Sequence, residues 1–202
     1  MSYQAPVNET LFFLENCTSL SRLPVPDLSP DLVRSVLEEA GKFAGEKVAP
    51  LNRIGDREGT PFENGVVRMP KGWKETYRAW CEAGWQGLGA PTEYGGQALP
   101  ALINMVCAEF WNSACMAWAL GPLLTSAAIE AMHAHASEVL KKKYLAKLVS
   151  GEWTGTMQLT EPQAGSDVGA LTTRAVRNSD GTYKLKGQKI FISYGEHDMT
   201  DN

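Results

Sequence analysis

The spacing of apolar residues along the chain changes near Gly151. Before Gly151, apolar residues recur every three or four positions, the period of a helix that buries one face. After it, apolar and polar residues alternate and turn-forming residues become frequent, which is typical of strands joined by tight turns. The pattern predicts an α+β protein, with an antiparallel helical domain at 1–152 followed by the first strands of an antiparallel β-domain at 153–202.

The helical domain shows clear start and stop signals. Ser29 is a good N-cap, and the proline after it suits the first turn of a helix that we expect to end at Pro50. Further helices are predicted over Gly72–Trp85, from Leu102, from Pro122, and from Ser137 to a stop at Gly151. The last helix carries an apolar stripe of Val139, Leu140, Tyr144, Leu145, Leu148 and Val149. The short connections favour antiparallel packing.

The β-domain is predicted from alternation and turn chemistry. Thr154–Thr160 is a candidate strand, Thr172–Arg177 alternates, and Tyr183–Ile192 is its expected partner. Asn178–Gly181 contains Asp-Gly, which tolerates the positive φ angles that a hairpin turn needs. Because so few strands do not complete a domain, we expect this β-domain to be incomplete.

Composition narrows the class of protein. The chain has 202 residues, 44% of them hydrophobic and 21% charged, with a net charge of −4, as in an ordinary soluble globular protein. The acidic balance argues against nucleic acid as a partner, and we interpret the run Lys141–Lys143 as a solvated helix face. Met116–Leu124 is the longest apolar stretch, well short of the roughly 20 residues that span a membrane. With no signal peptide visible, a cytoplasmic location is expected.

No metal site is expected. The four cysteines form no Cys-x-x-Cys pair, so zinc is not indicated and reduced thiols fit best. His133 and His135 stand two residues apart on a helix and therefore point to different faces. His197 lies between two acidic residues, which we interpret as an ordinary polar loop.

The segment LTEPQAGSD at residues 159–167 carries the most chemical information. It is read as a strand that ends in a loop of small and hydroxyl-bearing residues. Such a loop can present backbone N–H groups and hydroxyls to the carbonyls and phosphates of a cofactor. The same residues could instead form a simple strand-to-strand turn with Asx-type hydrogen bonds. The residues alone leave both interpretations open.

Four ordered motifs resemble those of the acyl-CoA dehydrogenase family. LTEPQAGSD, followed by Ala170, resembles the first signature of that family. GLGAPTEYGG at 87–96, YLAKLVSGE at 144–152 and GQKIFIS at 187–193 resemble three further family motifs at matching separations. A narrower resemblance, carried by residues 3–7 and 194–199, is to the long bacterial branch that includes 3-methylmercaptopropionyl-CoA dehydrogenase.

The resemblance implies an FAD cofactor. Carried over position by position, it implies that the flavin is lined by Met157, Gln158, Leu159, Thr160, Ser166, Phe191, Ile192 and Ser193. Ser166 would also contact the thioester arm of the substrate. Gln158 departs from the small residue usual in the family. Phe191 replaces the common tryptophan, so it could stack on a flavin but would lack the indole N–H.

The resemblance also implies a reaction, the α,β-dehydrogenation of an acyl-CoA thioester. In the family a glutamate base removes the Cα proton while hydride passes to the flavin. That base belongs to a C-terminal helical domain, and no glutamate of this chain stands in the matching context. We therefore expect part of a longer, homo-oligomeric enzyme that passes electrons to an electron-transfer flavoprotein or a similar acceptor. By itself the chain should be inactive and bind FAD weakly or not at all.

Two other classes of function remain open at the level of sequence. One is an acyl-CoA-dehydrogenase-like flavoprotein of the alkylation response, which associates with DNA. That class would require a basic surface, and the net charge of −4 does not support one. The other is a non-catalytic interaction module built from the helices.

Overall fold

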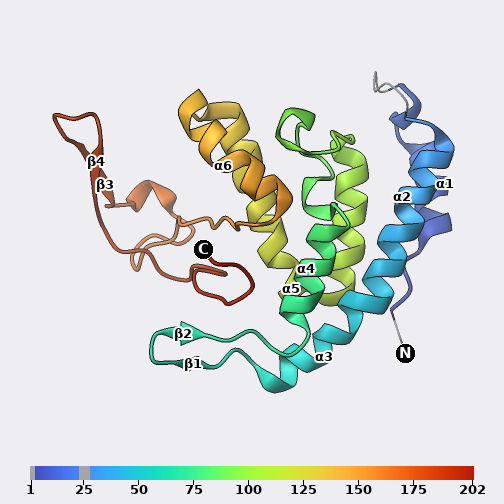
Figure 1. Cartoon of the computed structure of the whole chain (residues 1–202), viewed down its shortest axis with the longest axis horizontal. Coiled ribbons are helices and arrows are strands. Elements are labelled where there is room, and N and C mark those ends of the chain that lie inside the picture. The colour runs from blue at the N-terminus through green and yellow to red at the C-terminus, as the bar shows by residue number, and fades with distance from the viewer. Residues whose placement is uncertain (1–2, 23–27) are drawn as a thin grey trace. The chain divides into compact units, whose positions relative to one another are not determined.

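The computed structural model describes residues 3–22 and 28–202 (Figure 1). The chain divides into two compact units. The helical unit contains the residues up to Gly155 together with Glu196–Asn202, and the loop unit is Thr156–Gly195. The helical unit contains all of the long helices, whereas the loop unit contains one hairpin, so the predicted α+β class is confirmed.

The helical unit is built from α1 (Val7–Cys17), α2 (Pro30–Phe43), α3 (Ala49–Glu58), α4 (Trp73–Glu82), α5 (Ala101–His135) and α6 (Glu138–Ser150). Shorter helical turns are η1 (Leu20–Arg22), η2 (Ala44–Val48), η3 (Trp85–Gly87) and η4 (Thr92–Tyr94). An antiparallel hairpin of β1 (Phe62–Glu63) and β2 (Val66–Val67) follows α3.

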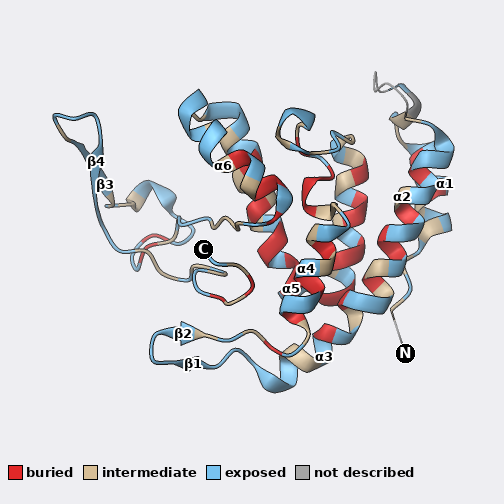
Figure 2. Cartoon of the chain, in the orientation of Figure 1, coloured by how far each residue is buried: buried red, intermediate tan, exposed pale blue. Residues whose placement is uncertain are grey.

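The core of the helical unit is centred on α5, which packs against α2, α3 and α6. Figure 2 shows the buried residues along the facing sides of these helices, while the strand residues are exposed except for Val67, which is half-buried. The largest fully buried apolar side chains are Trp80, Trp118, Phe110, Leu14, Leu37, Leu88, Ile103 and Leu145. Burying one such side chain contributes about 1.5–3 kcal/mol, so this cluster determines how the helices pack.

Two predicted helix ends are confirmed. Ser29 precedes α2, and its Oγ accepts a hydrogen bond from the N–H of Leu32 at 3.1 Å, as an N-cap does. Gly151 ends α6 with φ of 76° and ψ of 8°, the left-handed conformation that glycine adopts without a Cβ penalty.

The predicted helix end at Pro50 is wrong. The π-helical turn η2 leads from α2 into α3 without interruption, and the helical backbone ends at Gly59. The N–H of Ala49 donates to the carbonyl of Ala44, five residues back rather than four. This wider turn moves the preceding carbonyls away from the proline ring, which then occupies the first turn of α3, where its missing N–H costs little.

The two helices predicted from Leu102 and Pro122 form one element, α5, and the predicted start at Pro122 is wrong. The helix is interrupted at Cys115, where φ is −158° and ψ is 91°. The Cys115 sulfur is hydrogen-bonded to the backbone N–H groups of Ala117 and Trp118. The thiol thus takes the place of an N-cap side chain, and the second helical segment starts before Pro122.

The apolar stripe predicted for α6 is only partly buried. Leu145, Leu148 and Val149 are buried, whereas Val139 and Leu140 are 76% and 44% exposed. The buried residues pack in one cluster with side chains of α5 and of the loop that follows α4. The first turn of α6 lies outside that cluster, so its apolar residues face solvent.

The loop unit contains an exposed antiparallel hairpin of β3 (Arg174–Arg177) and β4 (Tyr183–Lys186). The turn predicted at 178–181 is confirmed: the N–H of Asn178 donates to the carbonyl of Thr182 at 2.8 Å. In that turn Asp180 Oδ1 accepts hydrogen bonds from the backbone and the hydroxyl of Thr182.

Two predicted strands do not form as expected. No strand forms over residues 154–160. At the start of the segment side chains bind the backbone instead: Asn202 pairs with both backbone groups of Thr154, and Thr125 Oγ1 accepts from the N–H of Gly155. The strand predicted over 183–192 ends at Lys186. It ends there because its partner strand stops at Arg174, beyond which the backbone N–H groups donate to a carboxylate.

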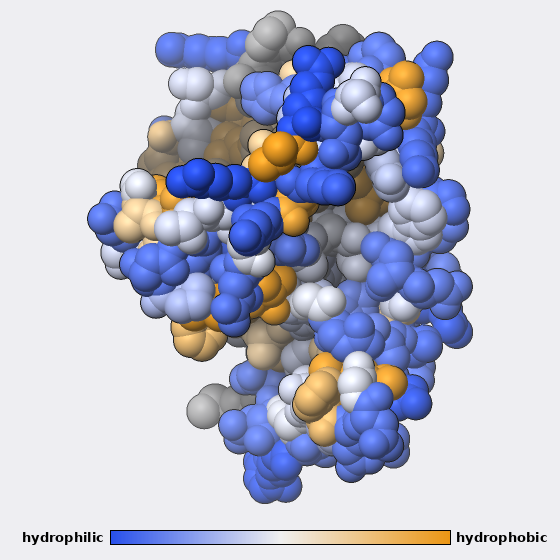
Figure 3. Space-filling model, turned by 90° about the vertical axis from the view of Figure 1, so that its left-hand side faces the viewer, coloured by the Kyte–Doolittle hydropathy of each residue, from blue (hydrophilic) through white to orange (hydrophobic). Residues whose placement is uncertain are grey.

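Among the described residues, α5 is the one helix that is long and apolar enough to cross a membrane, by length and composition alone. A core helix of a soluble protein passes the same test, so this is weak evidence for a membrane span. Ile103, Phe110 and Trp118 of α5 are at most 1% exposed within the helical unit. On the face drawn in Figure 3, hydrophobic side chains lie in separate patches among hydrophilic ones.

Candidate functional site

The loop predicted to bind a cofactor is organised around the side chain of Glu161, which is only 1% exposed. Its Oε2 accepts hydrogen bonds from the backbone and the hydroxyl of Thr172, at 2.8 and 2.9 Å, and from Gln163 Nε2 at 2.7 Å. Its Oε1 accepts from the N–H of Thr173 at 3.0 Å and from Lys189 Nζ at 2.9 Å. One carboxylate therefore connects three separate stretches of the loop unit.

The environment of Glu161 keeps it ionised. Hydrogen bonds from Thr173, Thr172 and Lys189 hold the pKa of this carboxyl far below its usual range, although desolvation opposes them. A carboxyl with so low a pKa cannot act as a general base near neutral pH, because the base must bind a proton during the reaction. Glu161 is thus a structural residue, in agreement with the sequence interpretation that placed it in the loop and gave it no catalytic role.

The two segments that the resemblance assigns to the flavin lie beside each other. Lys189 Nζ donates to the carbonyl of Leu159 at 2.9 Å as well as to Glu161. The N–H of Ile190 donates to the carbonyl of Thr160 at 3.0 Å. These bonds hold Leu159 and Thr160 beside Lys189 and Ile190, although about thirty residues separate the two segments in sequence.

The predicted site residues present groups that a ligand could use. Met157, Leu159 and Phe191 are 62%, 41% and 87% exposed. Within the described residues, the hydroxyls of Thr160, Ser166 and Ser193 make no hydrogen bond, and no backbone N–H of 157–160 donates one. Gln158 is exposed and donates to Thr156 Oγ1, and Ile192 is half-buried. Exposed apolar side chains next to free donors suit a ligand with both a ring and a polar edge.

The backbone near these residues departs from ordinary geometry. Phe191 and Tyr194 have φ angles of 56° and 57°, although neither is glycine. Bulky residues rarely adopt the left-handed region, and such strain is concentrated at functional sites. The strained residue Phe191 directly follows Ile190, whose N–H donates to the carbonyl of Thr160.

The sequence alone did not predict that Glu161 and Lys189 form an ion pair that joins the two motifs. Lys189 was noted only as part of the GQKIFIS motif, and its ion pair with Glu161 at 2.9 Å was not predicted. A signal was present, because Lys189 is the one charged residue of GQKIFIS, whereas LTEPQAGSD carries two carboxylates, Glu161 and Asp167. Buried charges require partners, so the two motifs could have been paired on that ground.

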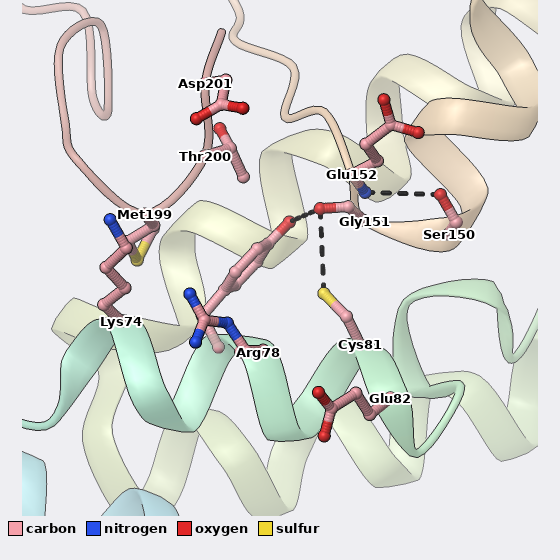
Figure 4. A pocket seen from close by; sticks show the side chains of 11 residues that line it. Lys74, Arg78, Cys81, Glu82, Ser150, Gly151, Glu152, Met199, Thr200 and Asp201 are labelled. Carbon is pink, nitrogen blue, oxygen red and sulfur yellow. Dashed lines mark hydrogen bonds between the residues drawn. The ribbon is translucent and has the colours of Figure 1, made fainter.

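A second candidate site is a cleft of about 480 Å³ in the helical unit (Figure 4). Lys74 and Arg78 of α4 line one side, and Thr200 and Asp201 belong to the segment opposite them. At its base the Tyr77 hydroxyl donates to the carbonyl of Gly151 at 3.0 Å. This bond fastens the end of α6 to α4.

The thiol in this cleft is poorly suited to nucleophilic chemistry. Burial raises the pKa of Cys81 to about 11, although its hydrogen bond with Tyr77 acts in the opposite direction. Since the thiolate is the reactive form, Cys81 is protonated and inert near neutral pH. Burial also raises the pKa of Tyr77 well above its ordinary value. Across residues 3–22 and 28–202, no three His, Cys, Asp or Glu residues lie close enough together to hold a metal ion.

The sequence of both units matches the sequence patterns of one protein family. Residues 31–152 match the pattern of the acyl-CoA dehydrogenase N-terminal domain, and residues 156–200 match that of the middle domain. The chain belongs to the acyl-CoA dehydrogenase family, and the resemblance inferred from the four motifs is confirmed.

Individual relatives agree with the family assignment. The whole chain is 45% identical to 3-methylmercaptopropionyl-CoA dehydrogenase of Ruegeria pomeroyi and covers 35% of that protein, which confirms the resemblance to that branch. The structure of butyryl-CoA dehydrogenase from Megasphaera elsdenii is similar with a TM-score of 0.68 and 28% identity, over 84% of this chain and 42% of that one. An acyl-CoA dehydrogenase of Bacillus anthracis, solved in complex with FAD, has a TM-score of 0.64 at 25% identity, over 89% of this chain and 29% of that one. The chain thus spans about a third of the length of the curated relative.

Proposed function

We propose that the chain is the N-terminal part of an FAD-dependent acyl-CoA dehydrogenase that catalyses α,β-dehydrogenation of an acyl-CoA thioester. Its 45% identity over the whole chain to a dehydrogenase of this kind carries the proposal. Residues 1–152 would form the helical domain, and residues 153–202 would begin the flavin-binding β-domain.

The proposed flavin contacts are the residues that the resemblance assigned: Met157, Gln158, Leu159, Thr160, Ser166, Phe191, Ile192 and Ser193. The hydroxyls of Thr160, Ser166 and Ser193 and the backbone N–H groups of residues 157–160, which are free among the described residues, support this assignment because they can donate to the polar edge of a ring system. Exposed Phe191 offers a flat apolar face for stacking. Bound FAD would accept the electrons removed from the substrate.

In this proposal Glu161 and Lys189 are positioning residues. The carboxylate holds Thr172 and Thr173, while the ammonium group holds the carbonyl of Leu159, so the loop is shaped before a ligand arrives. Such preorganisation lowers the ordering cost of binding. Ser166 would contact the thioester arm of acyl-CoA, and its hydroxyl has no other partner among the described residues.

The remaining parts of the proposal concern the whole enzyme. A glutamate outside this chain would be the catalytic base, and this chain alone would be inactive. The enzyme would be cytoplasmic and homo-oligomeric, would act in fatty acid metabolism, and would pass electrons to an electron-transfer flavoprotein or a similar acceptor. The longer relatives support the first of these statements, because this chain covers only 35% of the R. pomeroyi enzyme.

The test uses the complete enzyme that contains this chain, with Thr160→Val, Ser166→Ala and the control Ser179→Ala in the exposed hairpin turn. Anaerobic flavin reduction by acyl-CoA and thermal melts are measured on each variant. A lost hydrogen bond is worth about 0.5–1.5 kcal/mol, so flavin reduction or substrate affinity should fall roughly threefold to tenfold in the first two variants only. Unchanged kinetics with lower melting temperatures would show that the two hydroxyls merely stabilise a turn. A complete enzyme in which acyl-CoA does not reduce the flavin would refute the proposed activity.

A further inference from the structure

A separate pocket of about 300 Å³ lies between α5 and the loop that follows α4. It shares no lining residue with the cleft of Figure 4, and none of the Glu161 loop residues line it. Its polar lining residues include Gln86, Asn104, Ser126, Glu130 and His133, and its apolar ones include Ala90 and Ile129. A pocket of this size with both polar and apolar lining suits a small amphipathic molecule.

Gln86 is the first sign that something polar belongs in this pocket. The side chain is 4% exposed, and its Nε2 donates to Ser126 Oγ at 3.0 Å. Ser126 in turn donates to the carbonyl of Pro122 at 3.2 Å. Gln86 Oε1 accepts no hydrogen bond from any described residue. Because the Ser126 hydroxyl proton is donated to Pro122, the group of Gln86 that faces Ser126 Oγ has to be the NH₂ donor, and Oε1 is left without a donor, which is uncommon for a buried amide.

Two further polar groups line the pocket without a partner among the described residues. Asn104 makes no hydrogen bond through its amide, and Glu130 makes no ion pair through its carboxylate. Gly89 provides the space for Asn104, because a Cβ added at Gly89 would lie 3.3 Å from Asn104 Nδ2.

The charge of the residues that line the pocket favours a positively charged ligand. Glu130 is the one carboxylate that lines the pocket, and no lysine or arginine of the described chain does. His133 stands among the lining residues with its Nε2 3.5 Å from Glu93. Acceptor groups thus dominate the wall, with Gln86 Oε1 buried and the Glu130 carboxylate negatively charged. A cation that donates hydrogen bonds would satisfy both.

We propose that this pocket binds a small organic ammonium ion. The ammonium group donates to Gln86 Oε1 and to the Glu130 carboxylate, and the alkyl part packs against Ala90 and Ile129. The proposal does not rest on the dehydrogenase activity, because the pocket is formed by the helical unit alone. Ordered water is the competing occupant, since it also fills small polar cavities.

The test titrates the ¹⁵N-labelled 202-residue chain with butylammonium and, as a matched neutral probe, with butan-1-ol. NMR follows the side-chain amides of Gln86 and Asn104. Butylammonium should shift both resonances saturably, with an affinity about tenfold or more above that of butan-1-ol, because hydrogen bonds to charged groups are stronger than neutral ones. Equal affinity for the two probes, or no saturable shift with butylammonium, overturns the proposal.

Variants separate binding from folding. Glu130→Gln should weaken butylammonium binding about tenfold, whereas Glu39→Gln, on the exposed face of α2, should leave it unchanged. Gln86→Met should abolish binding with little change in melting temperature, because removing a buried acceptor that has no donor offsets the loss of the hydrogen bond to Ser126. Unchanged binding in Gln86→Met, or a crystal structure grown with butylammonium that shows only water beside Gln86 and Glu130, would rule out the site.

Discussion

The substitution Gly151→Ala tests how much the contacts of Gly151 with Tyr77 and Cys81 contribute to stability at the end of α6. Gly151 has φ of 76°, and a Cβ added there would overlap Cys81 Sγ and lie 3.3 Å from the Tyr77 hydroxyl. The same residue's carbonyl accepts the hydrogen bond from Tyr77 at 3.0 Å and lies 3.9 Å from Cys81 Sγ (Figure 4). The substitution therefore strains the backbone and disturbs the contact between α4 and α6.

The expected loss of stability is the sum of three effects. An alanine in the left-handed conformation costs about 1–2 kcal/mol. Overpacking against Cys81 costs about 1–3 kcal/mol, and weakening the Tyr77 hydrogen bond costs about 0.5–1.5 kcal/mol. We expect a total of about 4 kcal/mol, or a fall in melting temperature of about 8–16 °C for a chain of this size.

Gly95→Ala is the matched control. Gly95 has φ of 90° and ψ of 11°, so its backbone is also left-handed, but a Cβ there would have no heavy atom within 4 Å. That variant should lose only about 1–2 kcal/mol. In a Cys81→Ala background, Gly151→Ala should cost less, with a coupling of about 1–3 kcal/mol in the double-mutant cycle.

Urea unfolding followed by tryptophan fluorescence measures all four variants, because Trp80 is buried on the helix that carries Tyr77 and Cys81. If Gly151→Ala loses no more stability than Gly95→Ala, the contact with Cys81 and Tyr77 does not hold the end of α6. If the stability losses of Gly151→Ala and Cys81→Ala are additive in the double-mutant cycle, the added Cβ does not clash with Cys81 Sγ.

Four further outcomes are expected. Glu161→Gln should speed amide hydrogen exchange at Thr172 and Thr173, and unchanged exchange would show that the carboxylate does not hold them. Because the folded pKa of Glu161 is lowered from its ordinary 4.5, its stabilisation is present above that pH and is lost as the pH falls below it; Glu161→Gln should remove that dependence. Burial lowers the pKa of His197 from its ordinary 6.5, against the opposing charges of Glu196 and Asp198. Stability should therefore be lost as the pH falls below 6.5, and His197→Gln should flatten the decline between pH 7 and 5, whereas identical slopes would contradict it. Cys115→Ala should lower stability by about 1 kcal/mol through loss of the helix cap, and equal stability in urea unfolding would show that the sulfur does not act as one.

Local chemistry made parts of this protein predictable from sequence. Ser29 caps α2 because its hydroxyl accepts a hydrogen bond from the nearby N–H of Leu32. Gly151 ends α6 because glycine has no Cβ to oppose the left-handed backbone conformation. The turn at 178–181 forms for a similar local reason. The motif at 159–167, together with the three other motifs, also indicated the family.

Features that depend on distant residues could be seen only in the tertiary structure. Pro50 does not end a helix, because a π-helical turn before it relieves the clash that a regular helix would impose. The strand predicted over 183–192 stops at Lys186 because Glu161, from another segment, takes the N–H groups that would extend the ladder. Gln86 Oε1 has no donor among the described residues because the fold buries the side chain with its Nε2 bonded to Ser126, forty residues away. Sequence pattern determines which groups are present and how each short segment bends, whereas the free energy of burial determines which distant groups must satisfy one another.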